Sequence, residues 1–469
     1  MGMSSQILPF FRDCLPFRIP GKSPLDLYCT VNDCAGGALF FSPLSLAASH
    51  GGLSDACWLR SSNASGVGLR HPTVQEQKPR DTLCKEASMK NDRFRKGYRL
   101  ILVLILMVSA RSVTFAAGQE VKIGAALSMT GAAAAYGATQ KNGIQLASDE
   151  INAAAGSDGI KIFPLFDDDA SVPQQGINVY NKFINADRVA LIIGPTLSNT
   201  AQVTNRIAQQ SGVPVLAISN TAKGITDIGD YIFRDSLTEA VVIPNTIRVA
   251  KEKLGIKKVA ILYGDDDAFT KGGYDAFKNA LSDAGIEILS EMTFAKGDRN
   301  FSPQLTQLKS LNPDAIVVSA LVEEASGIVS QARQLGIPAT VPIIGGNGFN
   351  SPALIKNAGE SAEGVIVGAA WNMTSTNPLN KHFVDAYTNR FGSPPDQFAA
   401  QAYAGVYIAL EAVKKAGSAD NRKAIREAMA QIKDFDTVLG KFSFTAGRDA
   451  DHTPVVQTVK GGKFVVFGE

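Results

Sequence analysis

The sequence has few of the residues on which catalytic and metal chemistry usually depend. Its 469 residues include five cysteines, four histidines and two tryptophans. The cysteines all fall early in the chain: Cys14, Cys29, Cys34, Cys57 and Cys84. After Cys84 there is no thiol for a disulfide, a zinc site or a nucleophile. The later sequence also has no Gly-x-Ser-x-Gly elbow, phosphate-binding glycine loop or His-Glu-x-x-His pair. We therefore predict a protein that is not an enzyme, with no catalytic residue, no metal site and no cofactor.

The charges of the chain nearly cancel. Lys and Arg total 46, Asp and Glu total 44, and the formal net charge is +2. This balance gives no reason to expect a nucleic-acid partner. Hydrophobic residues make up 45% and charged residues 19% of the chain, which is typical of a globular protein with two or three domains. Two runs of aspartate, 167–169 and 265–267, lack the glycine spacing of a calcium loop and indicate solvated turns.

A segment that starts at Met89 has the order of a secretory signal peptide. Five basic residues precede an apolar run at 100–110, and small residues follow as far as Ala116. The apolar run is too short to span the ~30 Å of a bilayer core as a helix. We predict a signal peptide at 89–116, a mature chain that starts near Ala117, and export to the periplasm. On this hypothesis residues 1–88 are a non-native translation from an upstream start and are disordered.

From Glu120 onward, strand-like apolar runs alternate with helical segments, which indicates an α/β protein with parallel sheets. The order of strand, helix, strand, helix, strand, helix, strand occurs twice. The expected strands are 121–127, 160–166, 189–194 and 213–219 in the first half, and 258–264, 286–294, 314–320 and 340–346 in the second. The expected helices are 138–153, 173–186 and 199–211, then 272–284, 302–310 and 323–335. Two copies of one doubly wound unit predict two lobes.

Small polar residues gather where these strands end. The sequences "SMTGAAAAYG", "GPTLSNT" and "SNTAKGIT" follow strands of the first half, and "GDDDAFTKGG", "SALVEEAS" and "GGNGFNSP" follow strands of the second. In doubly wound sheets, ligands bind outside the carboxyl ends of the strands. The two sets of loops therefore predict a cleft between the lobes.

The stretch "GPTLSNT" has two interpretations. Ser198 or Asn199 is a common N-cap for the helix that follows. Alternatively, the hydroxyls and the free N–H groups of a helix N-terminus form an anion site. The repeated architecture favours the second interpretation, because it places this turn at the cleft.

The C-terminal third continues the α/β pattern. It begins with a strand-like run at 364–371 and a helix at 378–391, followed by a strongly apolar helix at 398–417 and another at 420–431. The last segments, "VLGKFSF" and "VVQTVKGGKFVVFG", alternate like antiparallel edge strands. His382 and His452 are isolated and are interpreted as surface residues.

Over residues 119–469 the chain resembles a type I periplasmic binding protein of the leucine/isoleucine/valine-binding group. The similarity is carried by "IGAALSMTGAAAAYG", "NGIQLASDEINAAAG", "IIGPTLSNTAQ", "GVPVLAISNTA", "LYGDDDAFTKGGYDAF" and "GESAEGVIVG", in this order. The resemblance implies two Rossmann-like lobes and three crossovers near 238, 370 and 439. Lobe 1 would comprise 117–238 and 371–438, and lobe 2 would comprise 239–370 and 439–469.

The resemblance also implies a ligand site in the first lobe. Ser198 matches the position that gives a hydroxyl to the ligand carboxylate. "ISNT" supplies a main-chain carbonyl at Ser219 and a hydroxyl at Thr221, with Asn220 between them. Tyr136 matches an aromatic residue that covers the ligand.

The second lobe departs from the family pattern. Phe269 and Leu321 stand where amino-acid receptors of the family have tyrosines, and Asn347 stands where they have the carboxylate that pairs with the ligand ammonium. An amide cannot neutralise a buried ammonium. Two alternatives remain: another acid serves, among Glu239, Asp267, Glu323 and Glu324, or the ligand has no α-ammonium.

The function implied is that of a monomeric solute receptor of an ABC importer. It would capture a small carboxylate-bearing ligand, such as a branched-chain or other aliphatic amino acid or a related amide or aromatic acid, and deliver it to a permease in the inner membrane. A ligand-sensing domain of the same fold that reports to a signalling partner is the alternative.

Overall fold

A computed structural model describes residues 118–156 and 159–468 of the chain. The predicted signal peptide and the segment 1–88 lie outside the described residues. A five-stranded parallel sheet, a seven-stranded mixed sheet and a small antiparallel sheet make up the strands of the described part.

The first lobe contains a five-stranded sheet in the order β2-β1-β3-β4-β5, in which every pair is parallel. Its elements are β1 (Glu120–Leu127), α2 (Ala134–Ala154), β2 (Lys161–Asp168), α3 (Pro173–Asn181), the π-helical turn η1 (Lys182–Asp187), β3 (Leu191–Ile193), α4 (Ser198–Gln210), β4 (Val215–Ala217), the 3₁₀ turn η2 (Thr226–Ile228) and β5 (Ile232–Arg234). The fifth strand, β5, is absent from the sequence-based expectation.

The second lobe repeats this arrangement. Its elements are α5 (Glu239–Leu254), β6 (Lys258–Gly264), α6 (Ala268–Asp283), β7 (Glu287–Phe294), α7 (Ser302–Ser310), β8 (Ala315–Ser319), α8 (Val322–Gln334), β9 (Ile343–Gly345), η3 (Asn347–Phe349), α9 (Pro352–Ala358), η4 (Gly359–Ala362) and β10 (Ile366–Ala369). The parallel strands lie in the order β7-β6-β8-β9-β10, which is the order of the first sheet. The prediction of two doubly wound units is confirmed.

The C-terminal elements divide between the two sheets. They are α10 (Pro378–Phe391), α11 (Gln397–Ala416), α12 (Arg422–Met429), β11 (Phe435–Thr437), β12 (Gly440–Phe444), β13 (Ala450–Asp451), β14 (Val455–Lys460) and β15 (Lys463–Val466). The hairpin β14-β15 extends the second sheet, with β14 antiparallel to β10.

The third crossover differs from the expected position near 439. Strands β11, β12 and β13 form a separate sheet, and Phe442 and Phe444 pack into the same core as Phe233 of β5. Asp449 accepts a hydrogen bond from the guanidinium of Arg234 at 2.5 Å. The chain therefore stays with the first lobe through β13 and crosses between Asp451 and Val455.

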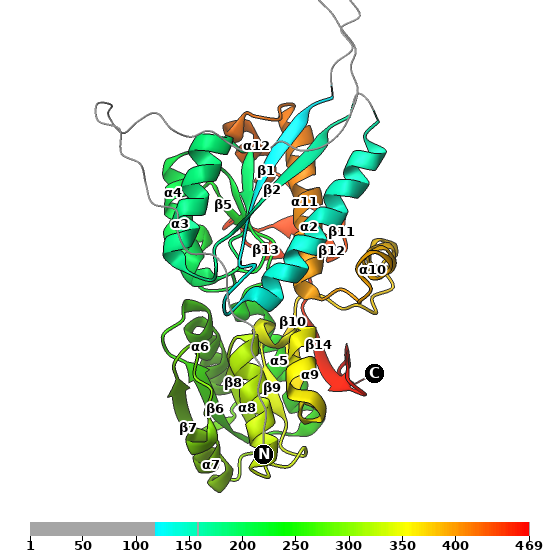
Figure 1. Cartoon of the computed structure of the whole chain (residues 1–469). Coiled ribbons are helices and arrows are strands. Elements are labelled where there is room, and N and C mark those ends of the chain that lie inside the picture. The colour runs from blue at the N-terminus through cyan, green and yellow to red at the C-terminus, as the bar shows by residue number, and fades with distance from the viewer. Residues whose placement is uncertain (1–117, 157–158, 469) are drawn as a thin grey trace, which may run out of the picture. The chain divides into compact units, whose positions relative to one another are not determined.

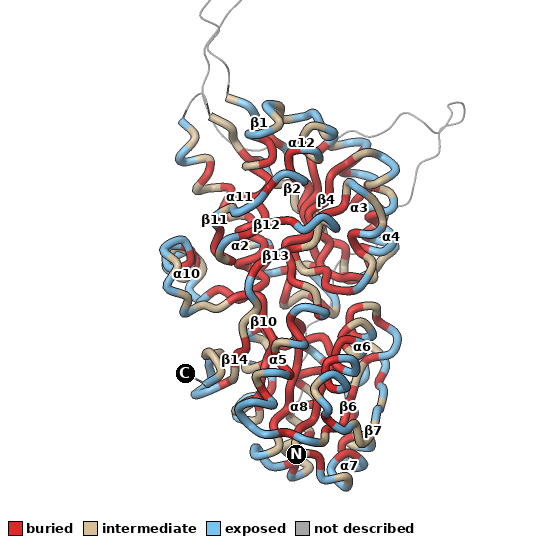
Figure 2. Tube along the Cα trace, turned by 180° about the vertical axis from the view of Figure 1, so that it is seen from behind, coloured by how far each residue is buried: buried red, intermediate tan, exposed pale blue. Residues whose placement is uncertain are grey.

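The central strands of both sheets are buried on both faces, as parallel strands covered by helices must be. In β1, Val121, Ile123 and Leu127 face one core cluster, whereas Ala126 faces another. In β6, Val259 and Leu262 likewise face opposite sides of the second sheet. Figure 2 shows the interior of both lobes mainly as buried chain.

Helices cover both faces of the first sheet. Figure 1 shows α3 and α4 on one face and α2 with α11 on the other, which agrees with the residues of the two core clusters. The helices α2 and α11 approach closely at Gly143. A Cβ atom at Gly143 would lie 2.3 Å from the carbonyl oxygen of Ala399. The apolar helix α11, although late in the sequence, is therefore part of the first lobe.

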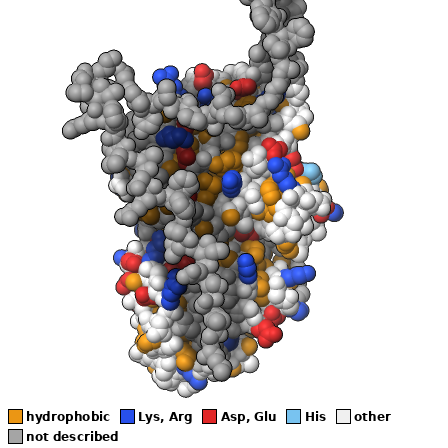
Figure 3. Space-filling view, in the orientation of Figure 1, with side chains coloured by type: hydrophobic (Ala, Val, Ile, Leu, Met, Phe, Trp, Pro, Cys, Tyr) orange, Lys and Arg blue, Asp and Glu red, His pale blue; other side chains and the backbone are white. Residues whose placement is uncertain are grey.

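The visible surface carries charges of both signs. On the face drawn in Figure 3, Lys and Arg side chains are interspersed with Asp and Glu side chains wherever described atoms are exposed. None of the helices in the described residues is both long and apolar enough to cross a membrane.

We predict opposite effects for two glycine-to-alanine substitutions within helices. Gly143→Ala forces α2 away from α11, and we expect it to lower the free energy of unfolding by about 1–3 kcal/mol. Gly272→Ala on α6 is the matched control, because its Cβ would meet no atom closer than 3.8 Å. There the better helix propensity of alanine should stabilise the protein by up to about 1 kcal/mol. Urea unfolding measures both, and equal stabilities would contradict the close approach of α2 and α11.

Candidate functional site

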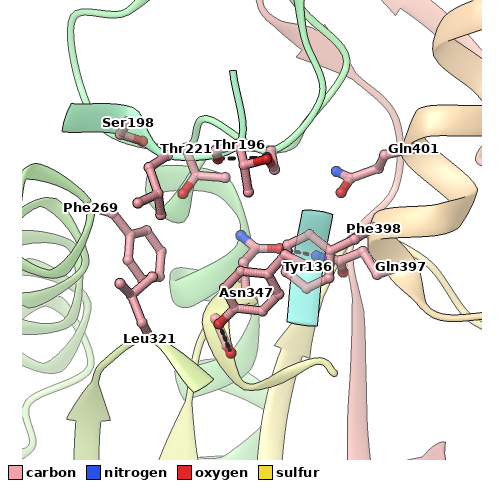
Figure 4. Close-up of a pocket in the computed structure, with 13 residues that line it drawn as sticks. Tyr136, Thr196, Ser198, Thr221, Phe269, Leu321, Asn347, Gln397, Phe398 and Gln401 are labelled. Carbon is pink, nitrogen blue, oxygen red and sulfur yellow. Dashed lines mark hydrogen bonds between the residues drawn. The ribbon is translucent and has the colours of Figure 1, made fainter. Parts of the chain in front are cut away.

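A cavity lies between the two lobes, where the loops after the parallel strands meet the start of α11 (Figure 4). The empty space between its walls, counted together with the solvent at its mouth, is about 390 Å³. The residues that line it are Tyr136, Thr196, Leu197, Ser198, Ser219, Thr221, Phe269, Leu321, Asn347, Gly348, Gln397, Phe398 and Gln401. Seven of the eight residues predicted from the sequence are among them.

The β3–α4 loop forms the upper wall of the cavity in Figure 4. Gly194 has a φ of +112°, and a Cβ there would lie 2.1 Å from the carbonyl oxygen of Ala126 on β1. The next peptide bond, to Pro195, is cis. The hydroxyl of Thr196 accepts a hydrogen bond from the N–H of Ser128 at 2.9 Å and donates to the side chain of Gln140 at 2.7 Å. The loop is thus fixed against the ends of β1 and α2.

Ser198 is the first residue of α4 and does not act as its cap. The N-cap residue is Leu197, which provides no side-chain acceptor. The first N–H groups of α4 consequently have no side-chain cap, and the positive end of the helix dipole remains at this point. The Ser198 hydroxyl accepts one long hydrogen bond, 3.4 Å from the N–H of Ala222. This arrangement supports the anion-site interpretation over the simple helix cap.

The segment after β4 contributes one free hydroxyl. Thr221 is buried and its hydroxyl has no partner among the described residues. The hydroxyl of Ser219 donates to the carbonyl of Thr196 at 2.7 Å and accepts from Gln140 at 2.8 Å. Asn220, which we predicted to contact ligand, does not line the cavity. It donates its amide to the carbonyls of Pro195 and Thr196 at 2.9 and 3.1 Å, so its side chain holds the loop in place.

Tyr136 connects the two lobes. It lies in the first turn of α2, and its ring packs against Phe398 with the ring centres 4.3 Å apart. Its hydroxyl donates to the carbonyl of Gly348 and accepts from the N–H of Val322, both at 2.7 Å. Burial raises the pKa of Tyr136 well above its usual value. Tyr136 therefore covers the cavity, and its hydroxyl holds the first lobe against the second.

A second contact between the lobes lies beside Ser198. The side chain of Asn199 donates to the carboxylate of Asp267 and accepts from the N–H of Ala268, each at 2.8 Å. Asp267 in turn caps α6 by accepting from the N–H groups of Phe269 and Thr270. The N-termini of α4 and α6 are thus joined directly.

The second-lobe wall is apolar apart from Asn347. Phe269 and Leu321 are 7% and 5% exposed and share a hydrophobic cluster with Tyr136 and Phe398. Neither of them carries a polar group toward the cavity. This side of the site therefore presents an apolar surface to the cavity.

Both ends of the Asn347 side chain are occupied by protein groups. Its amide nitrogen donates to the carbonyl of Leu237 at 3.2 Å, and its oxygen accepts from Gln397 at 2.9 Å. The Gln397 oxygen accepts from the N–H of Ala370 at 2.6 Å. Asn347 thereby links the loop after β9 to the first and second crossovers.

The four acids considered as partners for an ammonium do not line the cavity. Glu239 accepts from the N–H of Asn347 at 3.2 Å and lies behind it. Asp267 caps α6, Glu324 accepts from the N–H of Gly297 at 2.9 Å, and Glu323 is exposed. No charged side chain lines this cavity.

Sequence reasoning missed several cavity residues, notably Gln397, Phe398 and Gln401 on α11. The two glutamines are four residues apart and lie on one face of the helix. The sequence feature that could have indicated them is a repeated amide in an otherwise apolar helix.

His452 also differs from expectation: it is 9% exposed and packs beside Phe442, and burial lowers its pKa to about 4. His382 lies at the surface, 3.0 Å from Glu150.

Two doubly wound lobes that enclose a small cavity define a solute receptor. The chain belongs to the type I periplasmic binding proteins of the leucine/isoleucine/valine-binding family, since the family model described as "Periplasmic binding protein" matches residues 120–463. Proteins of this family are the substrate-binding receptors of ABC importers, and this chain is one of them.

Individual relatives show the same extent of similarity. The Leu/Ile/Val-binding protein BraC3 of Rhizobium johnstonii is 31% identical over 340 residues, which are 71% of this chain and 90% of the relative. The structure of LivJ from Streptococcus pneumoniae in complex with isoleucine has 33% identity and a TM-score of 0.70, and covers 74% of this chain and 98% of its own. A solute-binding protein from Rhodopseudomonas palustris in complex with 3,4-dihydroxy benzoic acid has 27% identity and a TM-score of 0.68, with coverages of 74% and 95%.

The buried carboxyl of Glu239 predicts a pH dependence of stability. Burial raises its pKa to about 7, from an ordinary value of 4.5. Between these two values the folded protein binds more protons than the unfolded chain, so the free energy of unfolding falls as the pH rises through this window. The loss from this group alone is about 3 kcal/mol between pH 4.5 and pH 8.

Replacement by glutamine isolates this contribution. Glu239→Gln keeps an acceptor for the N–H of Asn347 and removes the ionisation. We expect the variant to match the wild type near pH 4.5 and to be more stable near pH 8, as measured by urea unfolding at both values. Asp396, whose pKa is also raised to about 7 by burial, is present in both proteins and cancels in the difference. Parallel pH profiles would show that Glu239 titrates normally.

Proposed function

We propose that the protein captures a small carboxylate-bearing solute in this cavity and presents it to an ABC permease. The observation that carries the proposal is the uncapped N-terminus of α4 beside two hydroxyls, Ser198 and Thr221, that have little or no engagement with the protein. Helix N-terminal N–H groups and hydroxyls are donors for an anionic oxygen. The carboxylate of the ligand binds here, and its apolar part lies against Phe269 and Leu321.

The ligand class follows from the walls and from the relatives. LivJ binds isoleucine, and the Rhodopseudomonas palustris protein binds a dihydroxybenzoic acid. Both ligands combine a carboxylate with a largely apolar remainder. Both therefore match a site that has anion-binding donors on one side and apolar side chains on the other. We propose a branched-chain or other aliphatic amino acid, or a related amide or aromatic acid. The cavity binds this ligand without chemical change, and the receptor works as a monomer with no nucleic-acid partner.

Closure of the lobes is the signal for the permease. The lobes are 118–238 with 371–451, and 239–370 with 455–468, and they are joined by three crossovers. Tyr136 and Asn199 of the first lobe contact the second lobe, and in the proposed cycle these contacts break when the cleft opens. A ligand that touches both walls adds free energy to the closed state and shifts the population toward it. The closed form is the one that the permease, in the inner membrane, recognises.

Removing the two hydroxyls tests the carboxylate site. The ligand is first identified by thermal-shift screening of amino acids and organic acids, where stabilisation by sugars or cations alone would refute the proposal. Ser198→Ala and Thr221→Val each remove one donor to a charged oxygen, worth about 1.5–3 kcal/mol, so we expect an affinity about 10–100-fold lower for each. Calorimetric titration measures this. Ser282→Ala, on the exposed face of α6, is the control, and unchanged affinity in both site variants would mean that the site is misplaced.

We also propose that the exported protein begins near Ala117, after a signal peptide at 89–116 that starts at Met89. The order of basic, apolar and small residues supports this proposal. N-terminal sequencing of the protein recovered from the periplasm should give Ala117 or a near neighbour. A mature chain that still contains Cys84 would contradict the proposed start at Met89.

A further inference from the structure

Gln401 carries two polar atoms that the protein leaves unsatisfied. The residue is 1% exposed and lines the cavity from α11. Neither its amide nitrogen nor its amide oxygen has a hydrogen-bond partner among the described residues. A buried donor or acceptor without a partner costs about 1–3 kcal/mol. A ligand that pairs with both atoms would remove this cost, and Figure 4 shows the amide group at the cavity.

Gln397, one turn earlier on α11, provides a comparison within the same helix. Its oxygen accepts from the N–H of Ala370 and the side chain of Asn350, and its nitrogen donates to Asn347. Every polar atom of Gln397 is therefore used to hold the cavity wall. Gln401 has the same side chain and a similar burial, but its amide forms no hydrogen bond within the described residues.

The cavity has no group that can neutralise a cation. Its lining contains hydroxyls, amides and apolar side chains, and no carboxylate. Asn347, in the place of the family's acid, uses both ends of its amide on the protein. An ammonium buried here would lack a counter-charge, which costs several kcal/mol. A neutral hydroxyl or carboxamide carries no such cost and can both donate to and accept from an amide.

We propose that the ligand is a carboxylate without an ammonium group, and that Gln401 is the specificity-determining residue that recognises its uncharged hydroxyl or carboxamide. This inference rests on the proposed function, because Ser198 and Thr221 hold the carboxylate. Gln401 then supplies one donor and one acceptor to the second polar group. Phe269, Leu321 and Phe398 enclose the apolar part of the ligand.

A role for Gln401 inside the lobe is the competing explanation. Gly405 lies one turn further along α11, and a Cβ there would be 3.2 Å from a carboxylate oxygen of Asp235. Asp235 is buried and its carboxylate also has no partner in the described residues. If Gln401 formed a hydrogen bond with Asp235, removal of the Gln401 amide would destabilise the ligand-free protein. If it serves the ligand, Gln401→Leu removes an unsatisfied amide and leaves the ligand-free protein equally or more stable.

The experiment compares ligands that differ in a single polar group. One series is leucine, leucic acid and isocaproic acid, which carry an ammonium, a hydroxyl and a hydrogen on the same carbon. The second series is para-hydroxybenzoate and benzoate. Calorimetric titration of the purified protein should show, in at least one series, that the hydroxy acid binds about tenfold or more tightly than its relatives, as a paired buried hydrogen bond requires.

Gln401→Leu should abolish this preference selectively. We expect the variant to bind the hydroxy acid about 10–100-fold more weakly than the wild type does, and to bind the matching acid without a hydroxyl within about threefold of the wild type. Its unfolding temperature without ligand should be equal or higher. Gln174→Leu on the exposed face of α3 is the control and should change neither affinity.

Several results would overturn the inference while leaving the receptor for carboxylates intact. These are tightest binding of leucine, equal weakening of the hydroxy and unsubstituted acids in Gln401→Leu, no weakening of either, or a lower unfolding temperature of the ligand-free variant. Failure of every carboxylate in both series to bind would instead refute the proposed function, and the inference with it.

Discussion

The hydrogen bond between Asn347 and Gln397, 2.9 Å long, is the contact on which the arrangement of the site depends. Through it the loop after β9 is tied to α11, and Asn347 also reaches the carbonyl of Leu237. Gln397 continues the connection to Ala370. One neutral network therefore joins a second-lobe loop, two crossovers and the helix that completes the first lobe. Since all of its members are uncharged, the closed geometry does not need a charge from the ligand to hold it.

Closure depends on few polar contacts and one apolar cluster. Tyr136 and Asn199 reach across the cleft, and Leu197 and Phe398 of the first lobe pack with Phe269 and Leu321 of the second. All of these contacts join the two lobes, so separation of the lobes would break them together. A ligand can shift the balance only by the difference in its interaction with the two states. Its contact with both walls therefore matters more than its affinity for either wall.

The hydrophobic periodicity of the sequence predicted most strands and helices of the fold. It failed for very short elements and for the question of which strands pair with each other. The strand ending at Leu127 and the turn at Gly194 were predictable, because buried strands and a Gly-Pro break leave clear patterns. β5 is only three residues long, and α5 follows it without a strong break, so the sequence pattern predicted neither element. The alternation of β12 identified a strand but not the sheet it joins, and the third crossover was placed too early. A pattern along one strand contains no information on its neighbour.

The site shows the same limit for single residues. Loop residues at strand ends could be placed in the cleft by topology, since the carboxyl ends of parallel strands share one edge. Asn220 lies outside the cavity lining, because its amide turns back to Pro195 while its neighbours face the cavity. Gln401 was missed because a helix buried on all sides gives no periodic signal for the face that meets a ligand.

Under the proposal, the amides of Asn347 and Gln401 determine which ligand the site accepts. At position 347 an amide whose two ends bind the protein removes a charge from the cavity and keeps the loop in place. At position 401 an amide with no partner in the described residues offers a polar group on a different wall. Under the proposal, the amide at 347 offers no counter-charge to a cation. The amide at 401 disfavours any ligand that leaves it without a hydrogen bond, because an unpaired buried amide is costly. The two amides would therefore select a ligand in two ways: by the hydrogen bonds it forms and by the cost of polar groups that a wrong ligand leaves without a partner. Buried sites can achieve large selectivity with few residues in this way.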